Sequence, residues 1–302
     1  MGTIEIEHQK LLEKGFDSVS VFLIPMMISN MAAGLISIET GFKGDSISLS
    51  TACASSSHAI GEAFRKIRDG YLDAAITGGA EAGISIFTLA GFYNMCALTD
   101  TSDENSASIP FDLRRNGFVM GEGAGVLFLE ELESAKKRGA KIFGEIVGYG
   151  ATSDAYHITK PDPEANSQKN AIVNCLKDAG ISYSDVDYIN AHGTSTKIND
   201  VMETKAIKLA FKEHAKDIFI SSTKSMTGHM LGAAGAAEAI ATIMALKEGV
   251  VPPTIGLKEK DPECDLFYTP NVAVEKDMRY AISSSFGFGG HNAVLSFKKF
   301  EG

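Results

Sequence analysis

The sequence predicts an α/β fold made of two related units. First, strand and helix patterns alternate from about residue 140 to residue 250, and such alternation is typical of sheets covered by helices on both faces. Second, the chain contains an internal repeat of one pattern: a strand, a turn of small residues and an alanine-rich helix. The two copies are S-L-S-T-A-C-A-S-S-S-H-A and the later F-I-S-S-T-K-S-M-T-G-H-M-L-G-A-A-G. We expect a duplicated unit, residues 1–137 and 138–302, with a site between the halves.

Composition limits the classes of function. The 302 residues carry a formal net charge of -10 at pH 7, whereas a nucleic-acid surface needs a basic face. No apolar run reaches the roughly 18 residues that a membrane span requires. The four cysteines are widely spaced without a C-x-x-C pair, so neither a zinc knuckle nor a disulfide framework is indicated. We expect a cytoplasmic protein that binds neither nucleic acid nor membrane.

In the amino-terminal part, helices are expected at residues 4–14 and 25–40. The second should pack on the core through an apolar stripe formed by Met27, Met31, Leu35 and Ile38. Alternating apolar residues then predict a half-buried strand at residues 46–50, followed by a helix that closes at Gly70. Residues 73–82 indicate a buried strand that runs into a glycine turn.

Residues 99–118 are polar and irregular, and a loop of this length is often functional. A glycine turn, a strand and a short helix ending at residues 136–138 follow it. The elements expected beyond residue 140 are strands at 142–150, 186–194 and 218–225, helices near 166–179, 200–211 and 233–249, and two carboxyl-terminal strands joined by a glycine turn.

Cys53 lies where the strand pattern changes into the helix pattern. A thiol at a helix N-terminus meets unpaired amides and the helix dipole, so we expect the thiolate to be favoured there. A lone cysteine is more often a small buried apolar residue. The residues on two later turns therefore decide between the two interpretations.

Two later glycine-rich turns carry reactive side chains: His192 in N-A-H-G-T-S-T, then Lys224 and His229 in T-K-S-M-T-G-H-M. Open α/β sheets place ligands at turns that follow strands. A single histidine is more often structural, but with Cys53 these turns supply a thiol, two imidazoles and an ammonium. The spacing matches no zinc pattern, and H-E-x-x-H, G-x-S-x-G, the P-loop and the dinucleotide fingerprint are absent from the sequence. We expect nucleophilic catalysis without a metal.

Four stretches resemble, in the same order, those of the β-ketoacyl-acyl carrier protein synthases: T-A-C-A-S-S, N-A-H-G-T-S-T, S-S-T-K-S-M-T-G-H-M-L-G-A-A-G and S-F-G-F-G-G-H-N-A. The resemblance covers essentially the whole chain. It implies a thiolase-like αβαβα fold of five layers and a homodimer. Initiating synthases carry asparagine where this sequence has His229, and thiolases use a second cysteine, so the Cys-His-His set resembles the type II elongating enzymes.

Family members run to on the order of 400 residues, so the resemblance also implies that roughly a quarter of the usual length is missing at the amino terminus. The first unit would then be incomplete. A sheet that lacks a strand has unpaired backbone groups and an uncovered core. We therefore expect the chain alone to be compromised in stability or activity.

The resemblance implies a decarboxylating Claisen condensation in fatty acid chain elongation. Cys53 would accept an acyl chain from the phosphopantetheine thioester of acyl carrier protein. Malonyl-acyl carrier protein would lose carbon dioxide, and the resulting enolate would attack the acyl-Cys53 thioester to give 3-oxoacyl-acyl carrier protein. His192 and His229 would stabilise the enolate by hydrogen bonds, while Lys224, paired with Glu238, would organise the histidines.

Supporting roles follow from the same resemblance. The amides of Cys53 and Phe286 would hold the oxyanion, and Phe286 also matches the aromatic gate beside the cysteine. The residues that match contacts to the pantetheine arm are Thr159, Thr194 and Thr196. No separate cofactor is implied, because the substrates are carried on phosphopantetheine. The candidates for docking the acidic carrier are Arg114, Arg115, Lys136, Lys137 and Arg138.

Two other functions stay open on the sequence. A polyketide-type ketosynthase would carry the same motifs and would differ in whether it accepts simple fatty acyl chains. A non-catalytic fragment that binds carrier protein or a partner subunit is favoured by the chain length, whereas the intact motifs favour activity.

Overall fold

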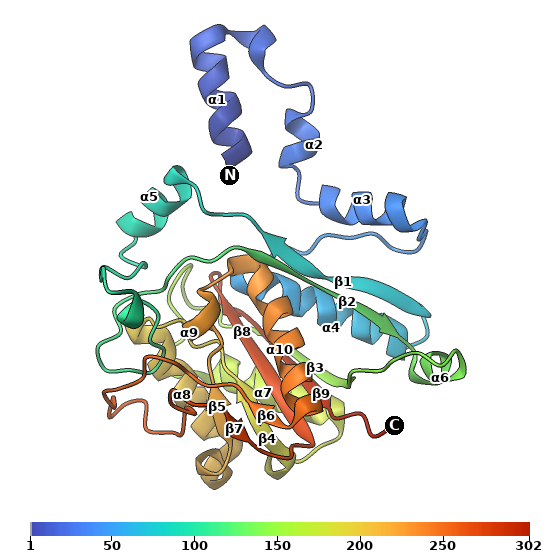
Figure 1. The fold of residues 1–302 in the computed structure, drawn as a ribbon, viewed down its shortest axis with the longest axis vertical. Coiled ribbons are helices and arrows are strands. Elements are labelled where there is room, and N and C mark those ends of the chain that lie inside the picture. The colour runs from blue at the N-terminus through green and yellow to red at the C-terminus, as the bar shows by residue number, and fades with distance from the viewer. Residues whose placement is uncertain (1) are drawn as a thin grey trace.

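The computed structural model describes residues 2–302 and arranges them in layers (Figure 1). The main sheet has five strands in the order β3-β9-β8-β4-β5. β4 is parallel to β5 and β8, whereas β9 is antiparallel to β8 and β3. The strand bounds are β3 (Glu145–Ser153), β4 (Val186–Asn190), β5 (Phe219–Ser221), β8 (Tyr280–Gly287) and β9 (His291–Lys298).

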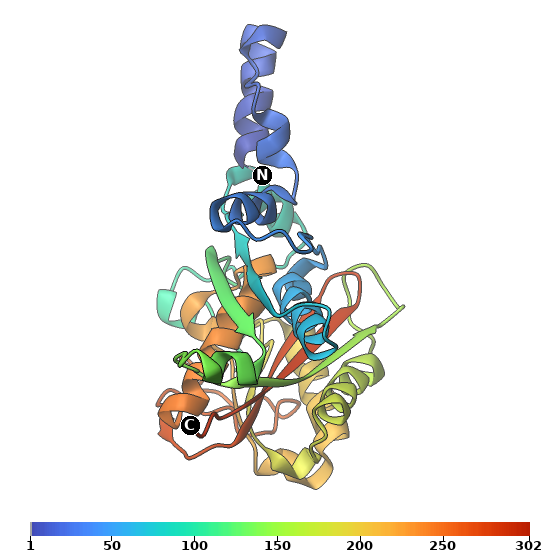
Figure 2. The same ribbon diagram turned by 90° about the vertical axis from the view of Figure 1, so that its right-hand side faces the viewer.

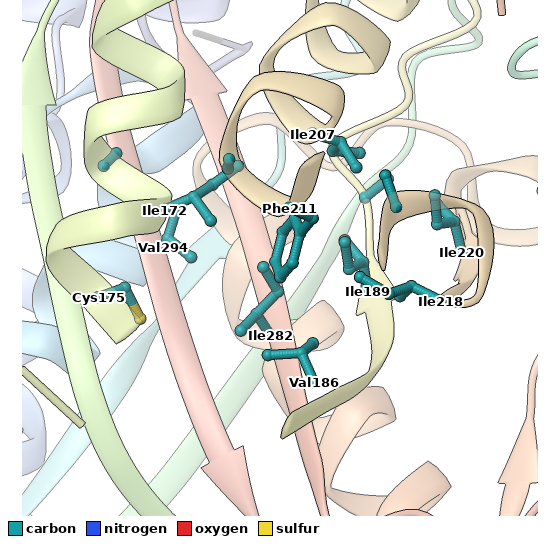
Figure 3. Close-up of a cluster of buried hydrophobic side chains, with 14 of the residues drawn as sticks. Ile172, Cys175, Val186, Ile189, Ile207, Phe211, Ile218, Ile220, Ile282 and Val294 are labelled. Atoms are coloured by element: carbon teal, nitrogen blue, oxygen red, sulfur yellow. The ribbon is translucent and has the colours of Figure 1, made fainter. Parts of the chain in front are cut away.

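Two helices cover one face of this sheet, α7 (Asn166–Ala179) and α8 (Lys197–Phe211). Figure 3 shows how Ile172 of α7 and Phe211 of α8 pack against Ile282 of β8 and their neighbours. The apolar residues of each helix recur three or four positions apart, which places them on one side of the helix. The alternation predicted beyond residue 140 is thus confirmed as a covered α/β sheet.

The other face is covered by α4 (Ser55–Arg68) and α10 (Ala234–Glu248). Beyond these two helices lies a second sheet, an antiparallel pair of β1 (Ala74–Glu81) and β2 (Gly123–Glu130). At Gly79 of β1, an added Cβ would lie 2.7 Å from the Ser56 Cβ. The glycine therefore allows the strand to approach α4 closely.

Three helices at the amino terminus stand away from the layered body: α1 (Gly2–Lys14), α2 (Leu23–Met27) and α3 (Met31–Thr40) (Figures 1 and 2). The single helix expected over residues 25–40 is wrong, because Ile28 is extended and separates α2 from α3. Its apolar stripe is also not in the core. Met27, Leu35 and Ile38 are 46%, 59% and 78% exposed.

The expected strand at residues 46–50 is also wrong, since this segment is extended but pairs with no strand among the described residues. The helix that follows is confirmed as α4, and Gly70, with a φ of 76°, lies beyond its end. Within residues 2–302 the second sheet contains only the strands β1 and β2, so residues 46–50 have no neighbouring strand with which to pair.

The remaining elements are short. They are α5 (Ile86–Asn94), α6 (Leu132–Lys137), α9 (Lys224–Thr227), β6 (Val250–Val251) and β7 (Val274–Glu275). β6 and β7 pair with each other, and residues 99–118 are largely irregular, as predicted. Over residues 2–302, none of the helices has both the length and the apolarity needed to cross a membrane.

Candidate active site

Cys53 lies in a short 3-10 turn, Ala52–Ala54, that leads directly into α4. Ala52 has a φ of 51°, a conformation that non-glycine residues adopt at a cost and that is often found at functional sites. Gly287, at the end of β8, faces this turn: an added Cβ there would lie 3.1 Å from the Cys53 amide nitrogen. The turn therefore holds Cys53 against the end of the main sheet.

The backbone amides of Phe288 and of Cys53 itself lie beside the thiol and act to lower its pKa. Phe286, the residue expected to supply the second amide and the gate, is instead buried in the core, with its ring centroid 5.9 Å from that of His192. The amide that lies beside the thiol is thus that of Phe288, two residues after the expected one. Phe288 lies just beyond β8, where the backbone turns towards the thiol.

The expectation that the thiolate of Cys53 is favoured is wrong. Burial raises the pKa of the Cys53 thiol to about 11, and the nearby Glu238 carboxylate raises it too. Lys224 and the two amides act in the opposite direction but do not outweigh the loss of hydration. At neutral pH, Cys53 is therefore a protonated thiol.

Lys224 lies near Cys53 and both histidines, because its charge lowers the pKa of all three groups. Its ammonium forms a buried ion pair with Glu238, and its Nζ lies 3.3 Å from His192 Nδ1. Because an ammonium can only donate, Nδ1 of His192 accepts and the ring proton belongs on Nε2. Each of the three side chains comes from a different part of the fold: the turn after β4, helix α9 and helix α10.

His192 and His229 lie edge to face, with ring centroids 5.3 Å apart and an interplanar angle of 85°. Burial holds the pKa of each imidazole well below its usual value, and the positive charge of Lys224 lowers both further. Both rings are therefore neutral at neutral pH. A neutral imidazole with its proton on Nε2 can donate one hydrogen bond without carrying charge.

The backbone of His229 is fixed by the end of the long loop. Its amide donates to the Val119 carbonyl at 2.7 Å, and its carbonyl accepts from the Gly121 amide at 2.9 Å. The Phe118 ring packs on the imidazole with 5.3 Å between centroids. His229 Nδ1 is buried and has no hydrogen-bond partner within residues 2–302.

Glu203 of α8 positions His192, a role that the sequence reasoning missed. Its two carboxylate oxygens accept from the amides of His192 and Gly193, both at 2.7 Å. Burial raises the pKa of the Glu203 carboxyl to about 8, although these amide hydrogen bonds lower it. The available signal was a charged residue on the apolar face of α8, four positions before the buried Ile207.

The candidate docking residues separate into two groups. Arg115 is buried, with its Nη1 2.6 Å from Asp261 and its Nε 3.4 Å from Asp200. It cannot meet a carrier protein, so its expected role is wrong. Arg114 donates to Asp112 but remains one-third exposed. The basic residues at the end of α6 are exposed, apart from ion pairs of Lys136 and Arg138 with nearby glutamates.

Two of the three candidate pantetheine-binding threonines lie together. Thr194 and Thr196 follow His192, with their hydroxyl oxygens 2.9 Å apart. Thr159 lies on a separate loop, where its amide donates to His157 Nδ1 at 3.1 Å. The adjacent Ile158 carbonyl accepts from the Gly289 amide at 2.8 Å, so this loop lies beside the turn that carries Phe288.

Solved structures define the class of protein. A structure titled as a type II PKS acyl-carrier protein in complex with its ketosynthase bound to the hexaketide matches with a TM-score of 0.94 and 36% identity, over 97% of this chain and 74% of that one. A β-ketoacyl synthase from Burkholderia phymatum matches with a TM-score of 0.93 and 39% identity, over 100% of this chain and 73% of that one. The fold is thus the expected thiolase-like fold of the condensing enzymes.

Two family models match successive parts of the chain, the β-ketoacyl synthase amino-terminal domain over residues 2–135 and its carboxyl-terminal domain over residues 143–258. The 3-oxoacyl-[acyl-carrier-protein] synthase 2 of Synechocystis is 54% identical over 99% of this chain and 72% of its own length. The Staphylococcus aureus enzyme of that name is 53% identical over 100% of this chain and 73% of its own length. The chain belongs to the β-ketoacyl synthase family, as its motifs predicted.

Replacing Glu203 tests its positioning role. Glu203→Gln keeps the shape but turns an NH2 group towards one of the two amides, so we expect destabilisation by about 1–3 kcal/mol. The pKa of about 8 in the folded protein exceeds the ordinary value of 4.5 for this carboxyl. The stability that Glu203 contributes to the wild type is therefore full below pH 4.5 and is lost as the pH rises to 8. Denaturant unfolding should therefore show a larger penalty at pH 5 than at pH 8. The control is Glu213→Gln, whose side chain is 94% exposed; a pH-independent difference would contradict the role.

The raised pKa of Cys53 predicts a pH dependence of alkylation. Only the thiolate reacts, so labelling by iodoacetamide should rise about tenfold per pH unit between pH 7 and 10. Mass spectrometry of the Cys53 peptide measures the rate, and Cys53→Ser gives the background from the other cysteines. A plateau already reached below pH 8 would mean that the thiolate is favoured after all.

Proposed function

We propose that this chain catalyses the decarboxylating condensation of an acyl chain on Cys53 with malonyl-acyl carrier protein, in fatty acid chain elongation. The observation that best supports this proposal is the contact of Lys224 Nζ with His192 Nδ1. The His229 ring lies edge to face with the His192 ring. The contact leaves Nε2 of His192 as a hydrogen-bond donor, and the charge of Lys224 lowers the pKa of both imidazoles and of the Cys53 thiol. The proposed nucleophile, donors and lysine are Cys53, His192, His229 and Lys224.

In the first half-reaction, the Cys53 sulfur attacks the acyl thioester of the carrier. A carbon–sulfur bond to Cys53 forms, the bond to pantetheine breaks, and the thiol proton passes to the departing pantetheine sulfur. The amides of Phe288 and Cys53, which lie beside the thiol and lower its pKa, would stabilise the oxyanion. Protonated Cys53 thus retains the proton that the leaving thiolate needs.

In the second half-reaction, the malonyl carboxylate leaves as carbon dioxide and its electron pair forms an enolate on the thioester. His192 and His229 donate hydrogen bonds to the enolate oxygen. The enolate carbon attacks the acyl-Cys53 carbonyl, the carbon–carbon bond forms, and the Cys53 sulfur leaves and is reprotonated from solvent. Lys224, held by Glu238, keeps the imidazoles neutral and oriented.

The partner is acyl carrier protein, since the curated relatives act as 3-oxoacyl-[acyl-carrier-protein] synthases and one solved ketosynthase is bound to its carrier protein. We propose that Thr159, Thr194 and Thr196 contact the pantetheine arm, that Arg114 and the end of α6 meet the acidic carrier, and that no separate cofactor takes part. We also propose a homodimer in the cytoplasm, with the apolar surface of α2 and α3 as support.

A polyketide ketosynthase is the second candidate, favoured by the 0.94 TM-score of the type II PKS complex. Its identity of 36% is well below the 54% of the fatty acid synthase relative. Condensation with a saturated acyl chain on the carrier separates the two functions, because an elongating synthase accepts such a chain.

Replacing Cys53 by serine should abolish acyl-enzyme formation and condensation, because a serine hydroxyl is a far weaker nucleophile than a thiol. Malonyl decarboxylation should persist, since the histidines are unchanged, and this shows that the variant is folded. Intact-protein mass spectrometry after mixing with acyl-carrier protein detects the acyl-enzyme. Condensation retained by Cys53→Ser would eliminate the proposed nucleophile.

The two histidines are tested by decarboxylation alone. We expect His192→Ala or His229→Ala to lower release of carbon dioxide from malonyl-acyl carrier protein by about 10²- to 10³-fold, as loss of one oxyanion donor does elsewhere. Acyl transfer to Cys53 should be affected much less. The matched control is His8→Ala, at an exposed position on α1. An unchanged decarboxylation rate in either active-site variant would remove that histidine from the mechanism.

A further inference from the structure

Arg115 lies in the irregular loop of residues 99–118, and its hydrogen bonds reach the segment that follows the His192 turn. The side chain is 2% exposed. Its Nε donates to the Thr196 carbonyl at 3.2 Å, and its Nη2 donates to the Lys197 carbonyl at 3.1 Å. Lys197 is the first residue of α8. The guanidinium therefore ties the long loop to the start of this helix.

The same loop also holds Ser195, the residue before those two carbonyls. The Ile109 amide donates to the Ser195 hydroxyl oxygen at 3.0 Å, and the Gly117 amide donates to the Ser195 carbonyl at 3.1 Å. Ser195 is fully buried and has a φ of 68°, a conformation that costs a non-glycine residue energy. Three successive carbonyls, those of residues 195–197, are therefore hydrogen-bonded to the loop.

These backbone contacts surround a pair of threonine hydroxyls. Thr196 is the N-cap residue of α8, but its side chain makes no cap hydrogen bond to any residue that the structure describes. Its hydroxyl oxygen lies instead 2.9 Å from that of Thr194. An N-cap threonine commonly accepts from an amide of the first helical turn, so this side chain has given up its usual partner. Its direction depends on the backbone conformation that the loop contacts fix.

We propose that Arg115 and Ser195 are positioning residues for the Thr194–Thr196 hydroxyl pair. One hydroxyl donates to the other, so the pair presents one free O–H donor together with oxygen lone pairs, which suits a ligand amide. The proposal rests on the proposed function, which assigns this pair to the pantetheine arm, and that arm contains amide groups. Loosening the backbone should therefore weaken binding of the carried substrate while the thiol and the imidazoles stay in place.

Hydrogen exchange measured by mass spectrometry tests the positioning. Arg115→Lys keeps the positive charge but replaces the planar fork by one nitrogen, which cannot reach both carbonyls. Ser195→Ala removes the acceptor of the Ile109 amide. In both variants we expect the amides of residues 193–200 to exchange at least tenfold faster, with β8 and β9 unchanged. The matched control is Arg68→Lys, an exposed arginine with surface ion pairs. Unchanged exchange at residues 193–200 in a folded variant overturns the proposal.

Decarboxylation of two substrates tests the consequence. Malonyl-acyl carrier protein carries the pantetheine arm, whereas malonyl ethyl thioester has the same reacting groups without it. We expect kcat/KM of both variants to fall at least tenfold on the carrier substrate, mainly through KM, and to stay within twofold on the ethyl thioester. Equal losses on both substrates would mean a general disturbance of the site and would overturn the positioning role, as would the absence of any loss on the carrier substrate.

The two measurements separate this proposal from the proposed function. If the wild type decarboxylates neither substrate, the proposed function fails, and hydrogen exchange by itself decides whether Arg115 and Ser195 hold the hydroxyl pair. Slow exchange of β8 and β9 shows that a variant is folded, and where one variant is unfolded the other decides. Unfolding of both variants would make the contacts purely structural and would overturn the proposal.

Discussion

The buried ion pair between Lys224 and Glu238 is the interaction on which the rest of the site depends. Two isolated charges would be expensive in this interior, and removing one partner of such a pair costs about 3–5 kcal/mol. Lys224, held by Glu238, places a positive charge beside His192. This charge lowers the pKa of both imidazoles, and the contact with Nδ1 places the ring proton of His192 on Nε2. The same charge partly opposes the burial that keeps Cys53 protonated.

A second buried acidic side chain, Glu203, supports the turn that carries His192. It holds the amides of His192 and Gly193, so the turn after β4 keeps its shape while Lys224 orients the ring. Asp200 on the same helix accepts from the Phe111 amide at 2.9 Å and lies beside buried Arg115. The side chains of Glu203, Asp200 and Arg115 are thus paired with backbone groups or with each other, as burial requires.

The layered architecture brings the reactive turns together. α4 starts after Cys53 and α10 starts after His229, and both helices lie between the two sheets. Cys53 and His229 therefore each lie just before the start of a central helix, although they are far apart in sequence. The second sheet is short, and residues 46–50, which lead to Cys53, border a groove beside β1.

The sequence by itself determined the alternating α/β pattern, the reactive turns around Cys53, His192, Lys224 and His229, and the family, because these depend on local periodicity and on motifs. Only the tertiary structure decided which amide reaches the thiol, that burial keeps Cys53 protonated, that Arg115 is internal and that Glu203 holds His192. The tertiary structure also shows that the apolar side chains of α3 are exposed and that residues 46–50 pair with no strand among the described residues. A sequence pattern indicates which residues prefer burial or strand pairing. The hydration, pKa and hydrogen bonds of a side chain depend on which distant segments of the chain pack around it.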